Sequence, residues 1–178
     1  MGLAVMVGKK RALLIWLLDQ DENKEFEIKP YRKARTNRQN SYYWVLIAKL
    51  ADKMRMSKIE LHNQMLRDYG QPYIVEGEQI YSMFPDTEET EAKLLREEFF
   101  HVAPTTNVRG GVKHNYRAYR LLRGSSTYNT EEMSILLDGL IQEAKNVGVE
   151  TLTPDELARM READLKHEQK ICEKRNSG

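Results

Sequence analysis

Basic side chains gather in residues 29–50, a stretch that contains no acidic residue. Five of the six lie within ten residues of one another: the set is Lys29, Arg32, Lys33, Arg35, Arg38 and Lys49. Thr36 and Gln39 have the spacing of a capping box, which predicts a helix beginning at about Asn37. The free N–H groups of a helix start attract anions. The segment is therefore either a phosphate-binding corner or a capped helix start with a solvated basic turn.

A second basic stretch follows later in the chain. Residues 99–130 contain no Asp or Glu, and their five cations are Arg109, Lys113, Arg117, Arg120 and Arg123. Residues 114–123, HNYRAYRLLR, are predicted to form a strand with arginines on both faces and tyrosines between them. Such a strand suits either the neighbourhood of a polyanion or an exposed sheet edge that charge protects from aggregation. Residues 101–113, which include Pro104 and Arg109-Gly110-Gly111, are predicted to be irregular.

An acidic stretch lies between these two regions. Residues 86–98 hold six acidic side chains. In the same segment, Asp86, Glu91 and Lys93 partly match the PD…(D/E)xK nuclease pattern. That chemistry needs the two acids on adjacent strands that converge on a metal ion. Here four residues separate the acids, and the second acid falls in a predicted helix. A metal-dependent nuclease is therefore an alternative and not the leading hypothesis.

The elements that would position these residues can be predicted from caps and breakers. The helix from about Asn37 has a wide apolar arc and should be largely buried. Ser57 and Glu60 form a second capping box, and Gly70 should end that helix. Residues 73–84 read as a strand, a turn and another strand. Thr87 should cap a charged helix to about residue 99.

The remaining helices are also marked by their caps. Thr130 is predicted to begin a helix to about Asn146, and Thr153 with Glu156 forms a third capping box. At the other end of the chain, residues 11–18 are apolar enough for a buried strand, and residues 24–29 alternate like a half-buried one. His62 is predicted to be a surface or partly packed histidine and not to bind a metal.

Length and composition predict one α+β domain: a small antiparallel sheet packed with about four to five helices. With 178 residues, we expect a flexible tail at 1–10, the domain at 11–152 and a charged C-terminal helix and tail at 153–178. The net charge is only +1, so an electropositive face must come from segregation of charge. One cysteine suits a reducing cytosol, and the short apolar run at 12–18 predicts neither export nor a membrane span.

Two stretches resemble known phage proteins. Arg35-Thr36, Gln39-Asn40 and Trp44 resemble the R-[ST]-x-x-Q-N-x-x-x-W signature of the NinB/Orf family of phage recombination proteins. Residues 123–157 closely resemble a group of uncharacterised phage and prophage proteins that combine such a stretch with an R-[ST]-x-x-Q-N element. The acidic segment 86–98 has no counterpart that can be placed in the better-known members.

The resemblance implies an α+β homodimer in the cytoplasm of a host bacterial cell that binds single-stranded DNA preferentially. It also implies a mediator role, in which the protein helps load a recombinase onto DNA coated by single-strand-binding protein. It carries no catalytic residues and no cofactor, so we expect no enzyme. The other alternative is a protein-interaction module of a phage replication complex.

The candidate nucleic-acid-binding residues are those that match the motif or carry segregated charge. They are Arg32, Lys33, Arg35, Arg38, Gln39, Asn40, Arg109, Lys113, Arg117, Arg120 and Arg123. Nothing in their pattern predicts readout of base edges, so sequence preference should be weak.

Overall fold

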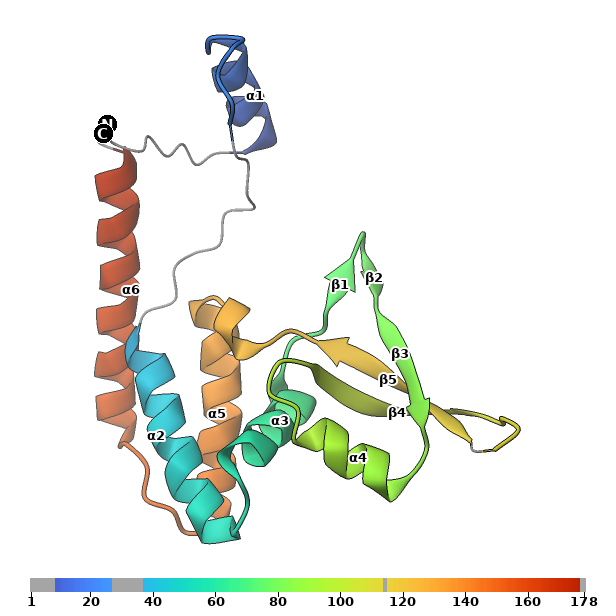
Figure 1. Ribbon diagram of the computed structural model, residues 1–178. Coiled ribbons are helices and arrows are strands. Elements are labelled where there is room, and N and C mark those ends of the chain that lie inside the picture. Colours follow the sequence, from blue (N-terminus) through green and yellow to red (C-terminus); the bar gives the residue numbers. More distant parts are fainter. Residues whose placement is uncertain (1–8, 27–36, 114, 177–178) are drawn as a thin grey trace.

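The computed structural model describes residues 9–26, 37–113 and 115–176 (Figure 1). Within these residues, helices form one side of the molecule and a small antiparallel sheet with α4 forms the other (Figure 1). This confirms the predicted α+β class. The helices are α1 (Lys10–Leu18), α2 (Asn37–Met54), α3 (Lys58–Tyr69), α4 (Glu88–Leu95), α5 (Thr130–Asn146) and α6 (Pro154–Asn176). The strands are β1 (Ile74–Val75), β2 (Glu78–Gln79), β3 (Tyr81–Pro85), β4 (His101–Arg109) and β5 (Tyr116–Leu122).

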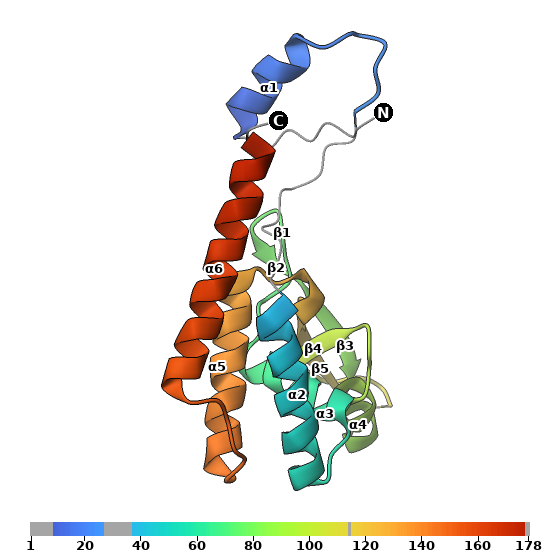
Figure 2. The same ribbon diagram turned by 90° about the vertical axis from the view of Figure 1, so that its left-hand side faces the viewer.

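The main core lies between α2, α3 and α5, and the first turns of α6 close it (Figure 2). The predicted apolar arc of α2 is buried there, with Tyr43, Ile47 and Leu50 fully enclosed. From α5, Leu136 and Leu140 meet them. Each such side chain contributes roughly 1.5–3 kcal/mol by leaving water. The helical side is therefore a rigid base against which the sheet is held.

The helix boundaries follow their caps. Ser57 and Glu60 form the predicted capping box of α3, and Thr153 with Glu156 bond in the same way before α6. Asn129 caps α5 from the position before the predicted start at Thr130. The predicted helix after Thr87 exists, but it ends at Leu95.

Gly70 ends α3 as predicted, for a different reason. Its backbone is extended, with φ −79°, so the left-handed conformation of a C-terminal glycine is not used. A Cβ atom at this position would lie 2.2 Å from the carbonyl oxygen of Leu66. The backbone at position 70 passes so close to the last turn of the helix that no side chain larger than the hydrogen of glycine fits.

The larger sheet has the order β3-β5-β4, with both pairs antiparallel. Its ladder between β4 and β5 is interrupted by a register shift between Pro104 and Val108. β1 and β2 form a short hairpin through the predicted turn, in which Glu76 and Gly77 have φ of 52° and 88°. A two-residue turn with positive φ at both residues has a backbone twist that matches the right-handed twist of the two strands it joins.

Four predictions about local structure were wrong in whole or in part. Residues 11–18 belong to helix α1, and residues 24–26 form no regular element; the rest of that predicted strand lies outside the described residues. Residues 101–109 form β4, which accommodates Pro104 because an edge strand needs no N–H donor on the side that faces away from the sheet. His62 is buried.

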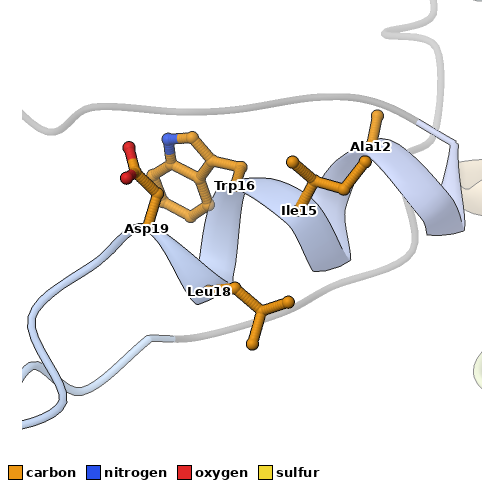
Figure 3. A pocket seen from close by; sticks show the side chains of 5 residues that line it. All are labelled: Ala12, Ile15, Trp16, Leu18 and Asp19. Atoms are coloured by element: carbon orange, nitrogen blue, oxygen red, sulfur yellow. The ribbon is translucent and has the colours of Figure 1, made fainter.

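Helix α1 stands apart from the body in both views (Figures 1 and 2), and none of its residues is buried. It lines a hollow of about 660 Å³ with Ala12, Ile15, Trp16, Leu18 and the following Asp19 (Figure 3). All five come from one helix and its end, so no second described element encloses the hollow. We therefore do not treat it as a binding site.

Candidate nucleic-acid interface

The strand register sorts the side chains of the larger sheet onto two faces. Residues directly opposite each other in an antiparallel ladder point to the same face. Tyr81 pairs with Arg120, Met83 with Ala118, and Tyr116 with Arg109. These residues of β3, β4 and β5 therefore share one side of the sheet.

Part of this side is covered, since Ala103 and Leu122 are buried in the main core. We call the exposed part the open face and define it by Tyr81, Met83, Arg109, Tyr116 and Arg120. All five are exposed, and the apolar members have exposed fractions of 56% for Tyr81, 42% for Met83 and 38% for Tyr116. No strand residue on this side is acidic. Aromatic rings beside arginines, free of carboxylates, are the combination that holds unpaired nucleic-acid strands.

The spacing on the open face separates the two rings. Alternate residues of a strand are about 6.7 Å apart, and Tyr81 lies opposite Arg120, four positions along β5 from Tyr116. The two rings are therefore roughly 13 Å apart along the strands. They cannot stack on the same base, so each would take a base of its own.

The opposite side, the covered face, packs against α4. Phe84, Val102 and Tyr119 form a second small core with Leu94 of α4. Glu91 of α4 ties this side together: one carboxylate oxygen accepts from Tyr119 Oη at 2.7 Å, and the other forms an ion pair with Arg67 of α3. The hydrogen bond to this carboxylate and burial raise the pKa of Tyr119 to about 12, with burial the larger cause.

Two of the predicted binding arginines are engaged inside the protein. Arg117 lies on the covered face, where Asp86 accepts from its Nε at 2.7 Å and from Nη2 at 3.2 Å. Arg123 donates from two nitrogens to Glu132, at 2.6 and 3.1 Å. A carboxylate that binds an arginine in this bidentate way neutralises its charge, so the arginine attracts a phosphate only weakly.

The other three predicted cations of this region point to solvent. Arg109 and Lys113 sit at the tip of the β4–β5 hairpin and form no ion pair with any described residue. Arg120 donates to the backbone oxygen of Arg67 at 3.2 Å and has no carboxylate partner in the described chain. These three side chains are available to phosphates along the hairpin and the open face.

The motif residues at the start of α2 are placed differently from one another. Arg38 is exposed, whereas Gln39 is 1% exposed and accepts a hydrogen bond from Ser134 of α5 at 3.0 Å. Asn40 is half-buried, and its Oδ1 has no hydrogen-bond partner among the described residues. Gln39 thus fastens α2 to α5 in the interior. Arg32, Lys33 and Arg35, with the cap residue Thr36, lie outside the described residues.

The two basic regions do not merge over the described residues. Figures 1 and 2 show the start of α2 on the helical side and the tip of the β4–β5 hairpin beyond the opposite edge of the sheet. Arg38 and Arg109 therefore belong to separate surfaces of one chain.

The two acids of the nuclease pattern have structural partners. Asp86 holds Arg117, and Glu91 holds Arg67 and Tyr119, as described above. No group of three or more His, Cys, Asp or Glu side chains suited to a metal ion occurs within the described ranges. The geometry gives both carboxylates a role in fastening α4 to the sheet.

A buried polar network links α2, α3 and β4. The hydroxyl of Tyr43 and Nδ1 of His62 are joined by a hydrogen bond of 2.8 Å, and the rings of His62 and His101 lie 5.7 Å apart. Burial, and to a smaller degree His101, lowers the pKa of His62 to about 4. Burial also lowers the pKa of His101. Both rings are therefore neutral at pH 7.

Four residues of interest were not among the candidate binding residues predicted from the sequence: Tyr81, Met83, Tyr116 and His101. Tyr116 was noted only as one of the tyrosines between the arginines of residues 114–123. Tyr81 and Met83 are signalled by the alternation of Tyr81-Ser82-Met83-Phe84, which puts one pair on each face of a strand. His101 had no signal, because it lies in a segment predicted to be irregular.

None of the helices in the described residues is long and apolar enough to cross a membrane. Comparison of the chain with protein-family models, with curated proteins and with solved structures finds no match.

Proposed function

We propose that the protein binds single-stranded DNA on the open face of its sheet and does no chemistry on it. The observation that carries this proposal is the open face itself: Tyr81 and Tyr116, each directly opposite an arginine, with Met83 between these two pairs, on a side without acidic strand residues. Stacking of a base on an aromatic ring is worth roughly 1–3 kcal/mol. A duplex hides its bases, so the open face favours a single strand.

The phosphates would be held by Arg109, Lys113 and Arg120. Neutralising about three phosphates of a single strand gives a log–log salt slope of roughly −2, so affinity should fall more than tenfold between about 50 and 200 mM salt. Stacking depends little on base identity, and none of these side chains is arranged to read a base edge. Sequence preference should therefore be weak.

The first experiment is fluorescence anisotropy with a labelled single-stranded oligonucleotide at two salt concentrations, with a duplex of the same sequence as control. Tyr81→Ala combined with Tyr116→Ala should weaken binding at least tenfold, since two stacking platforms are lost. Tyr81→Phe combined with Tyr116→Phe is the matched control and should keep the affinity, because the rings remain.

Unchanged binding by the alanine pair would move the site away from the open face. A loss on Arg35→Ala combined with Arg38→Ala, with no loss from the tyrosine pair, would assign the site to the start of α2. No binding even at low salt would overturn the proposal as a whole.

The resemblance to NinB/Orf proteins adds a wider role to this proposal. The protein would act as a homodimeric mediator that helps a recombinase displace single-strand-binding protein from DNA in the host cytoplasm. This role predicts that the purified protein speeds recombinase loading on coated DNA, and that the tyrosine pair abolishes the acceleration. Loading at the same rate with and without the protein would contradict it.

A further inference from the structure

A cleft of about 510 Å³ opens at the end of the sheet where β4 begins and β5 ends. Its apolar wall includes Tyr73, Phe99 and Phe100, and its polar residues include Glu98, His101 and Ser126. Phe99 is 89% exposed, which is unusual for so large an apolar ring unless something packs on it. The volume falls within the range of small-molecule sites, which are about 300–1,000 Å³.

The proton of His101 is fixed by its neighbour Asn63. The Asn63 amide nitrogen donates to the carbonyl oxygens of Leu95 and Glu97 at 2.8 and 2.7 Å. Its oxygen must therefore be the atom that faces Nδ1 of His101 at 2.7 Å, and an oxygen can only accept. Nδ1 carries the proton, so Nε2 of the neutral ring has a free lone pair.

That lone pair faces the cleft. A Cβ atom built on Gly124, another residue of the cleft, would lie 3.2 Å from Nε2 of His101. No described residue forms a hydrogen bond with Nε2. The absence of a side chain at position 124 keeps a fixed acceptor open to a ligand, which must supply an N–H or O–H group.

The charges around the cleft argue against an anionic ligand. Arg123 borders it, but its guanidinium is held by Glu132 and Thr127. Glu98 adds a carboxylate. A phosphate would meet this carboxylate and a nitrogen without a proton, whereas a neutral ring with an N–H group would meet aromatic faces and an acceptor.

We propose that the cleft is a nucleobase site, in which an aromatic ring stacks on the Phe99–Tyr73 wall and an N–H group of the base donates to Nε2 of His101. The site is separate from the open face and does not depend on it. The base could belong to a free nucleoside or to a DNA strand, and the test distinguishes these two sources.

The test follows the histidine signals of the full-length protein by NMR, with ring-labelled histidine. Millimolar adenosine should shift the His101 signal, which is identified by its loss in His101→Ala. N6,N6-dimethyladenosine keeps the stacking surface and lacks the donor, so it should bind about three- to tenfold more weakly, the worth of one net hydrogen bond. Ribose 5-phosphate should cause no shift.

Two further variants show whether a loss of adenosine binding comes from the cleft itself and not from a general effect of substitution. Gly124→Ala places one methyl group about 3.2 Å from Nε2, which the ring of His101 can accommodate by a small shift, and should block the change of the signal on adding adenosine while the ring remains to report. His167→Ala changes an exposed histidine of α6 and should leave adenosine binding unchanged.

A single-stranded oligonucleotide and adenosine are compared on the same signal. A shift with adenosine alone identifies a free nucleoside as the ligand, and a shift with the oligonucleotide alone identifies a base of a strand. No shift with either, or equal affinity for the dimethylated analogue, overturns the proposal. Anisotropy with the Tyr81→Ala and Tyr116→Ala pair tests the open face separately, and the His101 signal tests the cleft, so failure of one site leaves the other measurable.

Discussion

The two faces of the three-stranded sheet carry the same residue types and use them in opposite ways. On the covered face, Arg117 is neutralised by Asp86, and Tyr119 donates to Glu91. On the open face, Arg120 and Tyr116, taken from the same strand, have no carboxylate partner in the described chain and lie exposed. The segment of α4 makes the difference, because Glu91 of the helix and Asp86 just before its cap lie on one face only.

This comparison shows why charge segregation along a sequence is a weak guide to a binding surface. The acidic segment 86–98 looks like a separate module in the sequence, yet Asp86 and Glu91 act as counterions for the sheet and α3. The electropositive surface consists of what these acids leave unpaired. A protein with a net charge of +1 can thus present a face with no acidic strand residue.

The largest expected effect comes from breaking the covered face. Glu91→Ala leaves the hydroxyl of Tyr119 without a partner. It also leaves the side chain of Arg67, which is 9% exposed, with only the hydrogen bond from its Nε to the carbonyl oxygen of Val102. The Glu91 side chain is 37% exposed, so solvent screens part of the charge interaction. The loss of this ion pair and of the hydrogen bond to Tyr119 should lower the free energy of unfolding by about 2–3 kcal/mol, measured by urea denaturation. Glu89→Ala changes an exposed acid of the same helix and should lower it by less than about 0.5 kcal/mol. Equal losses in both variants would show that Glu91 does not hold α4 to the sheet.

The second effect separates the interior from the open face by pH. The folded-state pKa of His62 is about 4, below its ordinary value of 6.5, so the unfolded chain takes up the proton first as the pH falls. Stability is therefore complete above about pH 6.5 and is lost toward pH 4, with a loss of about 2 kcal/mol by pH 5. None of the five residues that define the open face titrates between pH 6.5 and pH 4. The DNA affinity of the folded protein should therefore stay constant over the pH range in which its stability falls.

Urea denaturation at pH 7 and pH 5 measures this loss, and His62→Gln is the control that should remove most of it. A wild-type protein equally stable at both values would contradict the assignment of a neutral, buried His62.

The smallest effect compares arginines of the two faces. Arg109→Ala with Arg120→Ala should reduce the magnitude of the salt slope for single-stranded DNA by about 1.4, because each free cation contributes roughly 0.7. Affinity at moderate salt should fall roughly fivefold. Arg117→Ala with Asp86→Ala removes a neutral pair and should leave the slope unchanged. Anisotropy titrations over a series of salt concentrations give the slopes of the wild type and of the two double variants. Equal slopes in the two double variants would contradict the difference between the two faces.

Most helix starts could be predicted because their signals are local. Ser57 with Glu60 and Thr153 with Glu156 place both partners of a cap within four residues, and the structure has these bonds. The wrong predictions needed information from elsewhere. Residues 11–18 form a short apolar run, which periodicity cannot assign to helix or strand. β4 was missed because Pro104 and the shifted ladder hide its alternation.

The candidate site could be predicted only in part for the same reason. Alternation along residues 114–123 placed Tyr116 and Arg120 on one side and Arg117 on the other. Which side faces water depends on where α4 packs, and that contact joins Leu94 to Val102 and Tyr119. Gln39 was predicted to bind nucleic acid because it is a polar residue of a motif. In the structure it accepts a hydrogen bond from Ser134, which is 95 positions away in the chain and could not be identified as its partner from the sequence.

The irregular ladder of β4 has a consequence for self-association. β3 and β4 are both outer strands, and an outer strand with a continuous row of free N–H and C=O groups is a template on which other chains can assemble. Pro104 deletes one donor from β4, the shifted register after it breaks the row, and Pro85 deletes another donor at the end of β3. Both outer strands of a sheet that exposes apolar rings on one face therefore offer only interrupted rows of hydrogen-bonding groups to another chain.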